Sequence, residues 1–102
     1  MDIKIAESAY KHGFTDESIY FCLFNSRADE MAGPTSSLKA QSNQGVATES
    51  WQRRLIVGFD HRGIALEIVG LEDIENNRLV VIHANKLQRK HYHLLQEDTN
   101  EL

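Results

Sequence analysis

Three runs of β-branched and other apolar residues, each of strand length, constrain the fold of this chain more than any other feature. They occupy residues 55–59, 64–71 and 79–82, and such runs are typical of β-strands. The connections between them, 60–63 and 75–78, are short and polar. Because short connections join antiparallel neighbours, the sequence predicts a meander of three to four antiparallel strands.

Helical patterns flank these strands. Residues 5–13 predict a short helix that Gly13 ends, and Thr15 is the expected N-cap of a second helix that runs to about Asn25. A third helix is predicted over residues 86–96. Its apolar face consists of Leu87, Leu94 and Leu95. The predicted fold class is therefore α+β, with two N-terminal helices, an antiparallel sheet and a C-terminal helix.

The long middle segment has a different composition. Residues 26–50 are rich in polar residues and glycine, with hardly a large apolar side chain. Such a segment inside a small domain is either disordered or a functional flap, and we expect a flexible loop. Trp51 should anchor the end of this loop. The residues expected in the core are Phe21, Cys22, Leu55, Val57, Leu66, Ile68, Val80 and Ile82.

Length and composition place the chain among single-domain globular proteins. It has 102 residues, of which 41% are hydrophobic and 25% charged, so one domain should span residues 1–102. The chain contains no apolar run of the roughly 18 residues that a membrane span requires, and its first residues do not resemble a signal peptide. A cytoplasmic protein is expected.

The sequence contains few signals of a metal site, a cofactor site or a catalytic nucleophile. Cys22 is the only cysteine, which excludes an internal disulfide and a multi-cysteine zinc site. His91 and His93 would point to different faces of a helix, whereas helical zinc ligands are three or four residues apart. No glycine-rich phosphate loop or nucleophile elbow is present. We therefore expect no metal and no cofactor.

The distribution of charge suggests a polyanionic partner. The formal net charge is -4, which argues against a protein that coats nucleic acid by bulk charge. Residues 83–93, however, contain basic residues and no acid, whereas residues 94–102 form an acidic tail. Basic side chains can hold phosphates, histidine can move a 2′-hydroxyl proton, and an aromatic ring can stack on a base. An alternative is that these side chains form an ordinary solvated surface.

Several loose motifs, in order, resemble the BrnT-like toxins of bacterial type II toxin-antitoxin systems. Residues 11–17, KHGFTDE, resemble the KHGIS-x-E element that opens those toxins. Arg53 and Arg54 lead into a strand with a glycine, and residues 78–86 resemble the family's last strand as it enters a helix. Where the family usually has Ser-Ala-Arg, this chain has His83, Ala84 and Asn85. The resemblance covers residues 3–25 and 52–95.

This resemblance implies a fold similar to that of RelE-type ribonuclease toxins and a ribbon-helix-helix antitoxin as partner. It suggests a toxin that cleaves RNA without a metal, through attack of the 2′-hydroxyl on the adjacent phosphate. The chain would be either a homodimer or part of a toxin-antitoxin hetero-oligomer. The proposed catalytic residues are His83, Arg54 and Lys86; the resemblance implies Arg54, as it implies His12 and Arg53, whereas His83 and Lys86 are proposed on their chemistry, as an acid or base and a phosphate ligand. The proposed RNA-binding residues are His12, Arg53, Arg89, Lys90, His93 and Tyr92.

Two alternatives remain open from the sequence. The chain could be a non-catalytic interaction domain that binds an antitoxin or another partner, which agrees with its acidic net charge. It could also be a plain structural domain whose residues 26–50 carry a linear binding motif.

Overall fold

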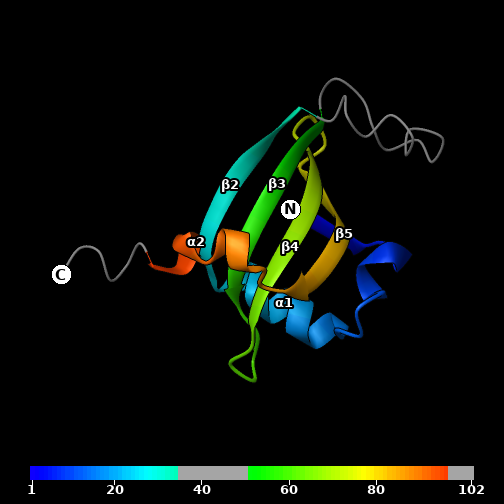
Figure 1. Ribbon diagram of the computed structural model, residues 1–102. Coiled ribbons are helices and arrows are strands. Elements are labelled where there is room, and N and C mark those ends of the chain that lie inside the picture. Colours follow the sequence, from blue (N-terminus) through cyan, green and yellow to red (C-terminus); the bar gives the residue numbers. More distant parts are fainter. Residues whose placement is uncertain (35–50, 97–102) are drawn as a thin grey trace.

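One mixed β-sheet dominates the computed structural model, which describes residues 1–34 and 51–96 (Figure 1). Its five strands lie in the order β1-β5-β4-β3-β2. β1 pairs with β5 in parallel, and all other neighbours are antiparallel. The strands are β1 (Asp2–Ile5), β2 (Ser26–Pro34), β3 (Trp51–Phe59), β4 (Ala65–Asp73) and β5 (Arg78–Lys86). The three apolar runs are thus β3, β4 and β5, but the predicted fold class, a meander with two N-terminal helices, is wrong.

The N-terminal segment is the first correction. Residues 5–13 do not form a helix; β1 is followed by a 3₁₀ turn, η1 (Glu7–Tyr10). Ile3 and Ile5 alternate with exposed residues and pack against the core, which is the two-residue period of a strand. β1 thereby occupies an edge of β5 that a meander would leave open, and it makes the sheet mixed.

The expected loop over 26–50 is the second correction. Its first nine residues form β2, an edge strand that pairs with β3 through an irregular register. A strand at the edge of a sheet can be polar and need not alternate apolar and polar residues. The polar sequence of β2 therefore did not indicate a strand. The remainder of the loop, residues 35–50, and the acidic tail, residues 97–102, lie outside the described residues.

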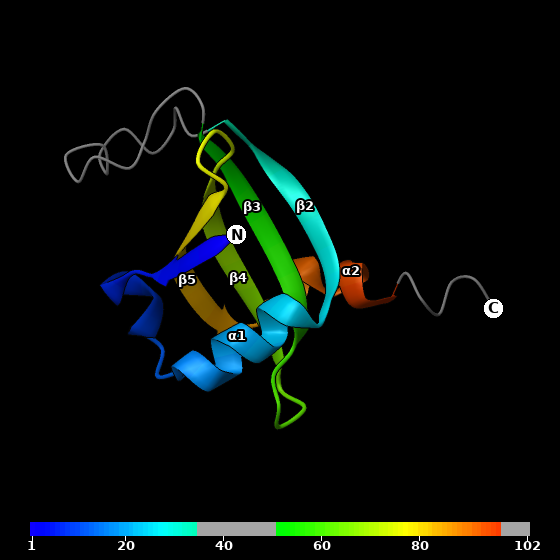
Figure 2. The ribbon, with the colours of Figure 1, turned by 180° about the vertical axis from the view of Figure 1, so that it is seen from behind.

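Helix α1 (Asp16–Phe24) packs on one face of the sheet (Figure 2). Thr15 is its N-cap, as predicted, and its side chain accepts a hydrogen bond of 3.2 Å from Ser18 N. The predicted core residue Phe21 is 42% exposed, because it points away from the face that buries Ile19 and Cys22. A Cβ at Gly58 would lie 3.2 Å from Cys22 Sγ, so glycine permits this close packing.

The predicted C-terminal helix over 86–96 is a third correction. The segment contains a 3₁₀ turn, η3 (Arg89–His91), and a short helix, α2 (His93–Gln96). The backbone N–H groups of Leu87 and Gln88 donate to Ala65 O and to the Glu67 side chain, at 3.0 and 2.8 Å. These bonds hold the chain against β4. Leu87 and Leu94 pack with Val57, and α2 lies on the face of the sheet opposite α1 (Figures 1 and 2).

The remaining predicted core residues divide by burial. Trp51 is 3% exposed and packs with Leu71 and Val80 of the sheet, as expected for an anchor. Leu55 and Ile82 are only half-buried. The predicted core residues that are buried are Cys22, Val57, Leu66, Ile68 and Val80.

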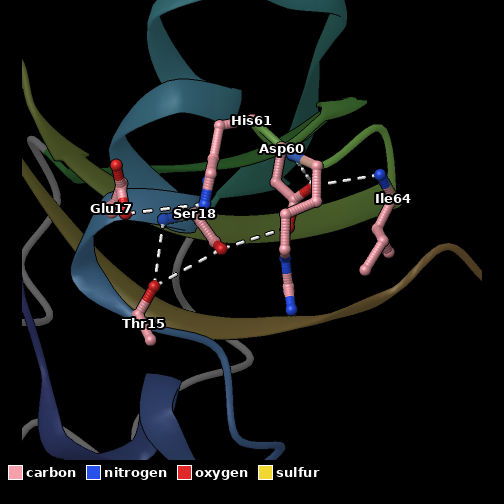
Figure 3. Close-up of polar contacts among 7 residues, drawn as sticks. Thr15, Glu17, Ser18, Asp60, His61 and Ile64 are labelled. Atoms are coloured by element: carbon pink, nitrogen blue, oxygen red, sulfur yellow. Dashed lines mark hydrogen bonds and ion pairs between the residues drawn. The ribbon is translucent and has the colours of Figure 1, made fainter.

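A buried carboxylate, Asp60, connects the β3–β4 turn to α1 (Figure 3). It accepts hydrogen bonds from Arg62 N and Ile64 N, both 2.9 Å, and from Ser18 Oγ at 3.1 Å. Burial raises the pKa of Asp60, but these hydrogen bonds outweigh that effect and lower it to about 2. Asp60 therefore fixes the turn and the helix as an anion.

Candidate functional site

The carboxylate of Glu67 lies between two imidazoles on the face of the sheet that α2 partly covers. Glu67 Oε1 is 3.0 Å from His91 Nδ1, and Oε2 is 3.3 Å from His83 Nε2. Gln88 N donates to Oε1 as well, at 2.8 Å. Glu67 is 5% exposed, whereas the side chains of His83 and His91 are 34% and 20% exposed. A buried carboxylate thus holds two imidazoles that solvent can reach.

Three elements bring these groups together. Glu67 lies on β4, and His83 lies on β5 opposite Val69, the next residue of β4 on the same face. A register irregularity between Val69 and Gly70 interrupts the β4–β5 ladder beside this pair. After β5 the chain turns back over β4, because Leu87 and Gln88 bond to it, and η3 then places His91 beside Glu67.

The electrostatics of Glu67 define the hydrogen-bonding pattern. Burial raises its pKa, but hydrogen bonds from His91, Gln88 N and His83 outweigh burial, so the pKa is lowered overall. An ionised carboxylate only accepts hydrogen bonds, and therefore His83 Nε2 and His91 Nδ1 carry protons. In the neutral imidazoles, His83 Nδ1 and His91 Nε2 are left as acceptors. This is how carboxylates fix histidine tautomers in acid-base sites.

His12 adds a third imidazole near this cluster. Its ring centroid lies 5.6 Å from that of His83, in an edge-to-face arrangement. It follows η1, which packs beside β5 through the hydrogen bond of 2.7 Å from Ser8 Oγ to Ile82 O. The structure thus brings together two of the histidines named from the sequence, His12 and His83.

Arg54 is not brought to this cluster. It lies opposite Gly70, whereas His83 lies opposite Val69. Consecutive residues of β4 point to opposite faces, so Arg54 and His83 lie on different sides of the sheet. The Arg54 guanidinium is paired with the carboxylates of Asp29 and Glu72.

Arg53 shares the face of His83, since it lies two residues from Leu55, which is opposite Val69. Its Nε is buried and has no hydrogen-bond partner among the described residues. Arg53 is thus a half-buried cation on the same face, two strands from His83.

The other predicted RNA-binding residues follow β5. Lys86 and Tyr92 line a surface hollow together with Ala65 and Leu87. Arg89 and Lys90 are exposed on η3, and His93 is exposed at the start of α2. The predicted basic segment thus supplies exposed cations on the chain that follows β5.

Glu67 and His91 are site residues that the sequence reasoning did not name. A signal for Glu67 existed, because it is the only charged residue within the apolar run 64–71, and a buried charge requires partners. His91 had no such signal, since its position depends on the chain reversal after β5. Within residues 1–34 and 51–96, no group of three or more histidine, cysteine or acidic side chains has an arrangement that could hold a metal ion.

Comparisons with known proteins identify no relative of this chain. No family model, curated protein or solved structure matches the chain. Within the described residues, every helix is too short or too polar to cross a membrane.

Proposed function

We propose that this protein cleaves RNA through the imidazole pair His83 and His91, held by the carboxylate of Glu67. The observation that carries the proposal is the contact of one buried, ionised carboxylate with both rings. Cleavage at a 2′-hydroxyl requires one group that accepts a proton and one that donates a proton, and two imidazoles can supply both. No metal enters this reaction.

In the proposed reaction, His83 is the base because it is the more exposed ring. Its Nδ1 takes the proton of the 2′-hydroxyl as the 2′-oxygen bonds to the adjacent phosphorus. The bond from phosphorus to the 5′-oxygen breaks, and protonated His91 donates its Nε2 proton to that oxygen. The products are a 2′,3′-cyclic phosphate and a 5′-hydroxyl. One positive charge moves from His91 to His83, and Glu67 remains beside it throughout.

The phosphate would be held by cations near the imidazoles. Lys86 lies opposite Leu66 at the end of β5, and it lines the hollow formed by Ala65, Leu87 and Tyr92. Arg53 offers a guanidinium on the same face with an unsatisfied Nε. Arg54, by contrast, would have to leave two carboxylates to reach a phosphate. We therefore assign phosphate binding to Lys86 and Arg53.

The resemblance of residues 11–17 and 78–86 to BrnT-like toxins supports a toxin role in the bacterial cytoplasm. A ribbon-helix-helix antitoxin would then be the protein partner. This part of the proposal rests on sequence motifs, whereas the proposed chemistry rests on the imidazole cluster.

A second candidate function is partner binding without catalysis. Phe21 and Phe24 on α1 are 42% and 71% exposed, and Tyr20 stacks on Phe24 with ring centroids 6.1 Å apart. Exposed aromatic rings are typical of protein interaction surfaces. This surface supports an antitoxin-binding role whether or not RNA is cleaved.

The decisive experiment measures cleavage of labelled RNA by purified protein with a metal chelator present. Wild-type protein should form 2′,3′-cyclic phosphate ends, and H83A and H91A should each lose at least about 100-fold in rate. H61A is the matched control, since His61 is 31% exposed and contacts Glu17 of α1. Absence of cleavage by folded wild-type protein, or full activity of the H83A/H91A double variant, would overturn the catalytic proposal.

A further inference from the structure

An apolar hollow of about 560 Å³ adjoins the imidazole cluster. It opens on the surface where the ends of β4 and β5 meet the segment that contains η3 and α2. The residues that line it are Ile64, Ala65, Lys86, Leu87, Tyr92 and Leu95. Apart from the ends of Lys86 and Tyr92, this lining is hydrocarbon, which favours a flat apolar group over a phosphate alone.

The hollow and the cluster are connected by direct neighbours in the chain. Ala65 lies two residues before Glu67 on the same face of β4, a separation of about 7 Å along a strand. Leu87 N donates to Ala65 O, and the next residue, Gln88, donates to Glu67. Tyr92 directly follows His91. A phosphate at the imidazoles would therefore have the hollow as its immediate neighbour.

The groups at the hollow suit a nucleobase. The Tyr92 side chain is accessible, since this residue is 47% exposed and borders the hollow, and aromatic rings stack on bases of any sequence. Lys86 supplies a cation at the same place, and residues 83–93 contain no acidic residue. The neighbouring Glu67 carboxylate is buried and already paired with His83 and His91. An apolar peptide would gain nothing from this charge pattern, so the charges favour a nucleotide.

We propose that this hollow binds an unpaired base next to the scissile phosphate, with Tyr92 stacked on the base and Lys86 on the phosphate beside it. This inference rests on the proposed function and makes it more specific: the substrate is single-stranded RNA. In a duplex the base is stacked between its neighbours, and Tyr92 cannot reach its face.

The test uses a dinucleotide that binds but cannot react, 2′-O-methyl ApA, followed by NMR of methyl groups. Its base should shift the methyl signals of Leu87 and Leu95 through the ring current. Y92A should weaken binding about tenfold or more, and Y92F should retain it, since the stacking ring remains. F24A is the matched control, because Phe24 is an exposed aromatic residue on α1. A65L, which fills the hollow, is a second variant should Y92A lose its native spectrum.

The outcomes separate this inference from the proposed function. If unmodified RNA is cleaved but the signals of Leu87 and Leu95 do not shift, or Y92A is as active as wild type, base binding in the hollow is refuted. The proposed cleavage by His83 and His91 would then still hold. Shifts at Leu87 and Leu95 that Y92A removes, without cleavage of unmodified RNA, would support the hollow as a base site and overturn the chemistry. Equal binding of a duplex that contains the same bases would overturn the inference of a single-stranded substrate.

Discussion

Glu67 Oε1 lies 3.0 Å from His91 Nδ1, although β4 and η3 are joined only through β5 and the turn after it. The same oxygen accepts the backbone N–H of Gln88. The carboxylate therefore both holds the chain reversal in place and orients the imidazole. Replacing a side chain with these two tasks should affect both folding and the proposed RNA cleavage.

Replacing Glu67 by glutamine should reduce the kcat of RNA cleavage by about 100-fold or more. Glutamine can still accept from Gln88 N, but it does not compensate the positive charge that moves between the rings. KM should change little, because Glu67 contacts imidazoles rather than RNA. E17Q is the control, since Glu17 contacts His61 on the other side of the sheet. A variant with a native spectrum and unchanged kcat would contradict the role of Glu67.

Replacing Asp60 by alanine should lower the free energy of unfolding by about 3 kcal/mol, because two backbone N–H groups and the Ser18 hydroxyl lose a buried acceptor. Urea denaturation followed by the fluorescence of Trp51 measures this change. E75Q replaces an exposed acid of the β4–β5 turn and should be nearly neutral. A loss below about 0.5 kcal/mol for D60A would contradict the anchoring role.

The stability of the protein should fall in acid. The folded state lowers the pKa of Asp60 from 3.8 to about 2, so its contribution is complete above pH 4 and is lost as the pH falls through about 2. That contribution is about 2 kcal/mol. The lowered pKa of Glu67 acts in the same direction. Urea titrations between pH 2 and 7 should show a smaller acid loss in D60N than in wild type, and equal losses would refute the assignment.

Replacing Thr15 by alanine should lower the free energy of unfolding by about 1 kcal/mol, because the α1 N-terminus loses the side chain that accepts from Ser18 N. T15S retains the hydroxyl and should recover most of the loss. Thermal or urea denaturation of the two variants provides the comparison. Equal stability of T15A and T15S would show that the cap contributes nothing.

Cys22 should not react in the native protein. Burial, followed by the charge of Asp60, raises the pKa of its thiol to about 12. A thiol reagent at pH 8 should label it only after urea has unfolded α1, and mass spectrometry can count the label. Since Cys22 is the only cysteine, no other thiol contributes to the signal. Complete labelling of the native protein within seconds would contradict this burial.

The parts of the fold that the sequence predicts correctly depend on local signals. The Thr15 cap and the short polar turn at 60–63 can each be recognised from a few adjacent residues. The cap predicts the start of α1, and the short turn predicts that β3 pairs with β4. β1 and β2 escaped prediction because their evidence is non-local. β1 has only four residues, which is too few for a two-residue alternation to be recognised. β2 can be recognised only through its pairing with β3.

The site residues likewise differ in whether a local sequence signal indicates them. His83 could be named because it ends an apolar strand within a basic segment. The meeting of Glu67 with His91 requires the backbone of residues 87 and 88 to bond to β4 rather than to continue a helix, which no residue pattern shows. Strand alternation separates the adjacent residues Arg53 and Arg54. The β3–β4 and β4–β5 registers are needed to show that Arg53, and not Arg54, shares the face of His83.

The parallel pairing of β1 with β5 has a consequence during synthesis. β1 is translated before its partner β5, and β2, β3 and β4 are translated between them. Until residues 78–81 have emerged, β1 has no strand beside it, and neither His83 nor His91 exists to accompany His12. Nascent chains that stall before β5 therefore lack both the neighbour of β1 and the imidazoles of His83 and His91. The imidazole cluster is complete only once the chain has been translated as far as His91.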